Sequence, residues 1–180
     1  MVYEFLADGF EIIEAMAPVD MLTRAGVEVK TVGVTGETVR ASCGAVVKTD
    51  LTIDAFDFYD VEAIILPGGM PGTLNLENSA AVQRAIDNSV NIGVPVCAIC
   101  AAPSILGHKG LLSGRRATCF PGFEEALSGA EIASEYVVRD GNFITARGAG
   151  VCIEFGLEIV RALKGADAAE QIKASIQYGK

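Results

Sequence analysis

Cys100 is the residue whose position most strongly suggests chemistry. The apolar run Val94–Ala98 predicts a buried strand, and the Ala-rich segment after Cys100 predicts the start of a helix. The small residues Ala98 and Ala102 flank the cysteine at two positions on either side, as the tight turn of a nucleophile elbow requires. A thiol at that turn faces the positive end of the helix dipole, which favours the thiolate. We therefore predict a reactive cysteine, although most free cysteines are buried and inert.

Glu14 is the candidate acid–base partner of this thiol. It lies one turn into a helix predicted over 11–25. One interpretation is a surface carboxylate that the helix dipole favours. The other is a carboxyl packed against Cys100, where burial favours the protonated acid, which would donate a hydrogen bond to sulfur and lower the pKa of the thiol. Glu11 competes for this role, because residues three apart share a helix face.

The Pro67-Gly68-Gly69 turn follows the apolar strand predicted over 63–66. It is either a simple loop in which glycine supplies a positive φ, or a source of backbone amides. In the second case the amides of Gly68 and Gly69 would hold a developing oxyanion together with that of Ala101. A dinucleotide site is disfavoured, because the segment does not match G-x-G-x-x-G.

Several other kinds of site find little support. His108 is the only histidine and lies eight residues after Cys100, about 12 Å along a helix axis. A Cys-His-Asp triad within one chain is therefore disfavoured. Cys97 and Cys100 match C-x-x-C, but the first cysteine falls inside a predicted strand, which argues against a redox motif. No cluster has zinc-ligand spacing, and we expect neither a metal nor a cofactor.

Composition narrows the class of protein further. The 180 residues fit a single domain, and 51% of them are apolar. A net charge of −9 disfavours nucleic acid and anionic membranes as partners. We find no apolar run long enough to cross a membrane and no signal-peptide pattern. The five cysteines are odd in number and lie mostly in apolar contexts, so we expect free thiols and a cytoplasmic protein.

Strand and helix patterns alternate along the chain. Strands are predicted over 2–6, 27–34, 45–49 (in a small hairpin excursion over 37–54), 63–66, 94–98, 116–119, 135–139 and 143–146. Helices are predicted over 11–25, 79–88, 151–163 and 168–176, and from position 100 onward. Pro18 should kink the first helix or mark its true start. The alternation predicts an α/β fold with a doubly wound, mainly parallel sheet and helices on both faces. Three loops, over 8–14, 67–72 and 99–103, then meet at the carboxyl ends of the strands, where such folds bind ligands.

The chain resembles the ThiJ/PfpI superfamily, in the branch of the Parkinsonism-associated deglycase, over nearly its whole length. The resemblance rests on four motifs in family order: Ala7–Glu11 with Glu14 and Pro18–Asp20, Leu66–Gly69, Ala98–Pro103, and Thr145–Gly150. It implies a single flavodoxin-like domain over 1–180 and a homodimer with the site near the interface. It also implies Cys100 as the nucleophile, Glu14 as its protonated partner and the amides of Gly68, Gly69 and Ala101 as donors.

Members of this superfamily are described as glyoxalases of the glyoxalase III type, which need no cofactor and convert methylglyoxal to lactate. They are also described as protein deglycases and as oxidative-stress sensors or chaperones. The resemblance therefore implies a small carbonyl compound or a glycated protein as the substrate. Sensing through Cys100 oxidation is the alternative function. An amidotransferase or peptidase activity is less favoured, because it normally requires a histidine base.

The chain departs from the family pattern in two places. Phe120 stands where several members carry a histidine near the active cysteine, which removes an acid–base group. Ala149 stands where a proline is common, which should loosen the loop after Arg147. Cys119 would then either approach the pocket as a second thiol or remain a buried strand residue. Arg147 and Arg24 would either bind an acidic group of the substrate or brace the interface.

Overall fold

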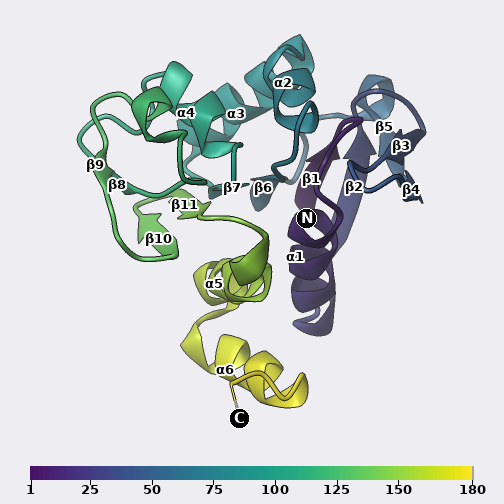
Figure 1. Ribbon diagram of the computed structural model, residues 1–180. Helices are drawn as coiled ribbons and strands as arrows, with labels where there is room; N and C mark the ends of the chain where they lie inside the picture. The colour runs from purple at the N-terminus through teal and green to yellow at the C-terminus, as the bar shows by residue number, and fades with distance from the viewer. Residues whose placement is uncertain (180) are drawn as a thin grey trace.

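The computed structural model describes residues 1–179, and its centre is a seven-stranded sheet in the order β10-β11-β7-β6-β1-β2-β5 (Figure 1). The strands are β1 (Val2–Leu6), β2 (Val29–Gly33), β5 (Leu51–Thr52), β6 (Ala63–Leu66), β7 (Val96–Ile99), β10 (Val137–Asp140) and β11 (Phe143–Ala146). All neighbouring strands pair in parallel except the antiparallel hairpin of β10 and β11. The predicted mainly parallel sheet is confirmed.

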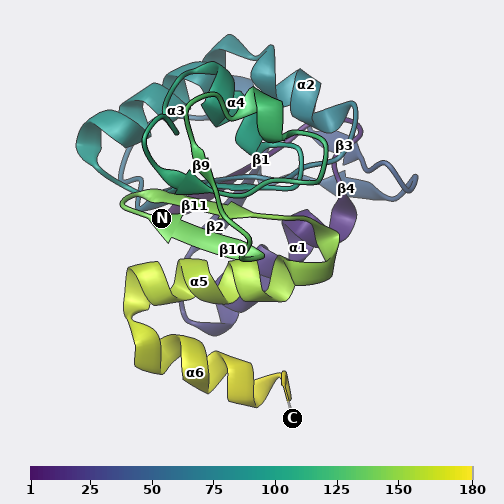
Figure 2. The ribbon, with the colours of Figure 1, turned by 60° about the vertical axis from the view of Figure 1, so that its left-hand side comes forward.

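Helices cover both faces of the sheet, as predicted (Figure 2). One face carries α1 (Ile12–Arg24) and α5 (Cys152–Lys164), with α6 (Ala166–Ser175) packed outside α5. The other carries α2 (Gly72–Glu77), α3 (Ala80–Ile92) and α4 (Pro103–His108). Alternate strand residues divide between two cores, so Ile64 packs toward one face and Ile65 toward the other. Within residues 1–179 no helix has the length and apolar character that crossing a membrane would take.

Short elements fill the connections. Two small sheets are formed by β3 (Thr38–Arg40) with β4 (Val46–Lys48) and by β8 (Arg116–Ala117) with β9 (Glu131–Ile132). Single 3-10 turns occur at η1 (Ile53–Ala55), η2 (Glu124–Ala126) and η3 (Ala149–Val151). The hairpin excursion is confirmed by the antiparallel pairing of β3 with β4.

Several predicted boundaries are wrong, for identifiable reasons. The helix predicted over 79–88 continues to Ile92, because Gly93 supplies the left-handed residue (φ +78°) that ends it. The strand predicted over 116–119 ends at Ala117 and pairs outside the main sheet. Pro18 does not mark the start of α1, which begins at Ile12 and runs on through the proline. The elements α2 and β5 were not predicted; both are short, and the two residues of β5 are too few for a periodic pattern.

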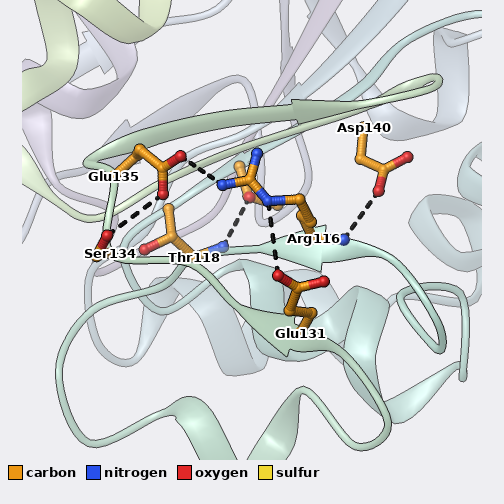
Figure 3. A network of polar contacts seen from close by, with 7 residues as sticks. Arg116, Thr118, Glu131, Ser134, Glu135 and Asp140 are labelled. Carbon is orange, nitrogen blue, oxygen red and sulfur yellow. Dashed lines mark hydrogen bonds and ion pairs between the residues drawn. The ribbon is translucent and has the colours of Figure 1, made fainter.

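The segment after β8 is held by a polar network centred on Arg116. Its partners are three acidic side chains, Asp140, Glu131 and Glu135 (Figure 3). Two residues later, the buried amide of Thr118 donates a hydrogen bond to the hydroxyl of Thr145 at 3.0 Å. These contacts fix the chain that leads to Phe120, and with it one wall of the region around Cys100.

Glu4 is a fully buried carboxyl in the middle of the sheet. It lies in β1, and neither of its oxygens has a hydrogen-bond partner among the described residues. Burial raises its pKa well above the ordinary value, so the native protein keeps this carboxyl neutral. A buried polar group without a partner costs free energy, so Glu4 weakens the fold.

We predict that Glu4→Leu increases the free energy of unfolding by about 1–3 kcal/mol, because it removes an unsatisfied buried group. The raised native pKa means that the native state binds more protons than the unfolded chain. The free energy of unfolding of the wild-type protein is therefore highest, as far as Glu4 is concerned, at low pH. It decreases as the pH rises above the pKa of Glu4 in the unfolded chain. The gain from the substitution should be larger at about pH 8 than at about pH 5, as measured by urea denaturation. The exposed Glu125→Leu is the control, and an equal gain at both pH values would contradict the prediction.

Candidate active site

The first turn of α1 separates the roles of its two acidic residues. Glu11 is the N-cap, and its carboxylate accepts hydrogen bonds from the amides of Ile13 and Glu14, both at 2.9 Å. Glu14 points inward and is only 1% exposed. The competition between these residues is thus resolved: Glu11 starts the helix, and Glu14 is buried at the carboxyl ends of the strands.

Gly68 is the residue that brings Glu14 to the thiol. Its amide donates a hydrogen bond to Oε2 of Glu14 at 3.0 Å. A Cβ atom at this position would stand 2.6 Å from both Oε2 of Glu14 and Cβ of Cys100, so only glycine fits between the two side chains. The Gly68 amide is therefore engaged by Glu14 here, and its binding of an oxyanion stays a prediction.

Cys100 sits on a sharp turn at the end of β7, as the elbow interpretation predicts. Its φ is +65°, a left-handed conformation that is uncommon for a residue with a side chain. Neighbouring segments hold it there: its amide donates to the carbonyl of Ala146, and its carbonyl accepts from the amide of Phe120, each at 2.8 Å. The helix that follows begins only at Pro103 and has six residues. No helix starts at the cysteine, so the predicted stabilisation of its thiolate by a helix dipole is wrong.

Backbone amides take the place of that helix dipole. The amides of Ala101 and Gly69 donate to the sulfur of Cys100 and oppose the increase in its pKa that burial causes. Gly69 has a φ of +91°, and a Cβ there would stand 2.5 Å from the amide nitrogen of Glu11. The turn can therefore approach the thiol only because it carries two glycines. Of the three predicted donors, Gly69 and Ala101 face the sulfur.

The ionised carboxyl opposes ionisation of the thiol, whereas the neutral thiol favours the ionised carboxyl. Burial raises the pKa of Glu14 to about 7, although the thiol of Cys100 and the amides of Gly68 and Ala149 oppose the increase. Burial also raises the pKa of Cys100 to about 12, and the ionised Glu14 contributes to the increase by its charge and by accepting the thiol proton. The lowered thiol pKa expected beside a protonated Glu14 stays a prediction, whereas beside the ionised carboxyl the thiol pKa is raised. A thiolate near neutral pH requires the proton to be on Glu14.

Two other predicted groups lie elsewhere. Arg24 is the last residue of α1, ten positions after Glu14 and about 15 Å along the axis, and it pairs with Asp20 at 2.8 Å. It is therefore not part of the site within one chain. Cys119 is 3% exposed and packs in the core on the α3 side, so it does not act as a second thiol in the pocket.

His108 and Cys97 have surroundings of their own. The imidazole of His108 is paired with Glu77, with 2.5 Å between Nδ1 and Oε1. Cys97 is fully buried within β7. Within residues 1–179, no group of three histidine, cysteine or acidic side chains is arranged to hold a metal ion.

Phe120, Arg147 and Tyr136 form the mouth of the site, and only the first two were predicted. Phe120 is 47% exposed, and Arg147 lies over the ring of Tyr136 with 5.4 Å between the guanidinium carbon and the ring centroid. Tyr136 falls within the strand predicted over 135–139, but a strand pattern does not indicate that this ring lies beside Arg147, so it was not predicted as a site residue. The Ala149 amide, which favours the ionised form of Glu14, was also not predicted: the sequence marks its loop only as glycine-rich.

We predict that Cys100 loses its proton in a way that depends on Glu14. The pair should lose one proton near pH 7 and the second near pH 12, so alkylation of Cys100 should increase in two steps separated by a plateau. In Glu14→Gln, a single step should lie between these two values, because only the thiol titrates. Iodoacetamide pulses followed by peptide mass spectrometry measure this. Identical pH profiles for the two proteins would exclude the coupling.

The chain is similar in sequence and in fold to known proteins. The DJ-1/PfpI family model matches residues 1–162. A Parkinson disease protein 7 homolog from Danio rerio is 35% identical over 176 residues, which cover 95% of this chain and 93% of that protein. A deglycase from Pyrococcus horikoshii is 33% identical over 162 residues, covering 88% and 96%. The structure of oxidised DJ-1 from Toxoplasma gondii superposes with a TM-score of 0.95 at 33% identity, covering 99% and 98% of the two chains. The chain therefore belongs to the DJ-1/PfpI family.

Proposed function

We propose that this protein is an enzyme that needs no cofactor and converts α-oxoaldehydes to 2-hydroxy acids, as in the conversion of methylglyoxal to lactate. The same chemistry would remove such aldehydes from glycated proteins. The observation that carries the proposal is the buried Glu14 carboxyl next to the Cys100 thiol, with two amides directed at the sulfur. Relatives named deglycases support the substrate class.

The first step forms a bond between the sulfur of Cys100 and the aldehyde carbon of R–CO–CHO. The electrons of the carbonyl bond move to oxygen, which takes the proton held by Glu14. Bonded sulfur is a weaker acceptor than thiolate, so the amides of Gly69 and Ala101 become free to stabilise the developing oxyanion.

The second step is an internal redox reaction. The ionised Glu14 removes the hydrogen of the former aldehyde carbon as a proton, and the ketone oxygen takes up a proton, which gives an enediol. The neighbouring carbon is then protonated by way of Glu14, while the hydroxyl on the former aldehyde carbon loses its proton and becomes the thioester carbonyl. The aldehyde carbon is thereby oxidised to a thioester and the ketone carbon is reduced to an alcohol, so no external oxidant is needed. Water then cleaves the thioester, which releases the 2-hydroxy acid and restores the thiol. The net reaction adds one water.

We predict that the wild-type protein forms lactate from methylglyoxal and that Cys100→Ala abolishes the reaction. Glu14→Gln should lower the rate on the order of 10²-fold or more, because the proton can no longer move between the two carbons. Lactate is measured enzymatically after quenching, and circular dichroism confirms that the variants are folded. No lactate from folded wild-type protein would refute the glyoxalase proposal.

A second candidate function is redox sensing through Cys100. Oxygen Oε1 of Glu14 is buried and has no hydrogen-bond partner among the described residues, so it is free to bond an oxidised sulfur. Cys97, Cys119 and Cys152 are buried in contrast to the half-buried Cys100. Sensing and catalysis are compatible, because both depend on one thiolate.

We predict that mild peroxide oxidises Cys100 to the sulfinate before it modifies any other cysteine. The exposed Cys43 is the matched control, since it is more accessible but lacks the carboxyl partner and the two amides. Tryptic mass spectrometry measures the oxidation at each position. Equal oxidation at positions 43 and 100 would argue against a specialised sensor thiol.

We also propose a homodimer with the site near its interface. The half-exposed Ile13, which directly precedes Glu14, is an apolar side chain that a second copy would cover. A peptidase or amidotransferase activity is not favoured, because His108 is paired with Glu77 and Phe120 supplies no base.

A further inference from the structure

An open groove of about 440 Å³ lies beside the buried pair. Its apolar wall is formed by Phe120, Pro121, Tyr136 and Val151, and its floor by the loop over 148–150. Phe120 and Tyr136 are 47% and 60% exposed, so much of their ring surface faces solvent. Large apolar side chains exposed together mark a place where a ligand or another molecule binds.

Gly148 lines the groove and lies between it and the carboxyl of Glu14. A Cβ atom on this residue would stand 3.2 Å from the ring of Phe120 and 3.9 Å from Oε1 of Glu14. That oxygen is the buried one without a hydrogen-bond partner. Phe120 is in turn tied to Cys100 by its amide. A molecule whose reacting carbon is at the thiol would therefore extend along this wall.

Arg147 supplies the charge of the groove. Its guanidinium lies over the ring of Tyr136, and its backbone amide is bonded to the carbonyl of that residue at 2.9 Å. No carboxylate within residues 1–179 lies close enough to form an ion pair with it. A cation held against an aromatic ring, without an acidic partner, is suited to bind an anionic group of a flat ligand.

We propose that this groove selects the substituent R of the substrate R–CO–CHO, and that it favours an aromatic R with a negatively charged far end. The inference rests on the proposed function and specifies its substrate class. The methyl group of methylglyoxal does not fill the groove, which then holds water, whereas an aryl group covers the rings of Phe120 and Tyr136. The charge on that group would then face Arg147. The bonds formed and broken are those of the reaction above.

Kinetic specificity tests the proposal with three aldehydes: methylglyoxal, phenylglyoxal and 4-carboxyphenylglyoxal. We expect kcat/KM for phenylglyoxal to be at least about tenfold higher than for methylglyoxal, because binding of a larger apolar group contributes at least this factor. We expect a further increase for the third. Aryl glyoxals also modify arginine, so initial rates are taken before intact mass shows any adduct.

Two variants separate the parts of the groove. Phe120→Ala should lower the ratio of kcat/KM for phenylglyoxal to that for methylglyoxal about tenfold or more. Arg147→Met should lower the ratio of kcat/KM for 4-carboxyphenylglyoxal to that for phenylglyoxal about tenfold, since a charged hydrogen bond is lost. Tyr59→Ala removes an aromatic ring that is 79% exposed and does not line the groove, so both ratios should stay at the wild-type values.

The outcomes distinguish this inference from the proposed function. If methylglyoxal is converted but phenylglyoxal is not preferred, or if Phe120→Ala leaves the ratio unchanged, the groove inference is wrong and the proposed function stands. If no aldehyde is converted by folded protein, both are wrong. If Phe120→Ala changes the oligomeric state in sedimentation velocity without changing the ratio, the groove is an interface between copies and not a substrate site.

Discussion

The hydrogen bond from the Gly68 amide to Glu14 holds a carboxyl at a place where it must share its surroundings with a thiol. Gly68 leaves so little room that a single added carbon would touch both side chains. Two negative charges at this distance and depth repel each other strongly, so the pair retains one proton over a wide pH range. A proton confined between a weak acid and a nucleophile is the requirement for a reaction that first protonates an oxygen and then moves a hydrogen between carbons.

The surrounding fold keeps this pair together at a cost in free energy. Glu11 satisfies the first amides of α1, which leaves Glu14 free to turn inward. Cys100 adopts a left-handed conformation that costs of order 1–3 kcal/mol, and hydrogen bonds to Ala146 and Phe120 on either side maintain it. These contacts come from α1, β11 and the segment after β8, which are distant in sequence. The site therefore depends on the whole sheet being correctly ordered.

Much of this arrangement could be predicted from the sequence, and the parts that could not share a physical cause. The strand over 63–66, the elbow at Cys100 and the mainly parallel sheet follow from apolar runs and glycine positions, which are local signals. The direction in which an amide points is not local. The amides of Gly68 and Gly69 are adjacent in sequence, yet one faces Glu14 and the other faces the sulfur. The sign of the thiol pKa shift likewise depends on the burial and charge of a residue from another element, so the helix-dipole argument alone was insufficient.

The position of the single histidine of the chain bears on which side chain can transfer protons at Cys100. His108 is half-exposed and committed to Glu77, and Phe120 is an aromatic ring without a proton to donate. In the proposed reaction every proton transfer at Cys100 falls to Glu14, because burial raises the pKa of this carboxyl to about 7, where it can both give and accept a proton. An imidazole at the position of Phe120 would add a second acid–base group and a polar wall. The ring makes that wall apolar instead, so the same substitution that removes a base also changes which substituent the mouth of the site can hold.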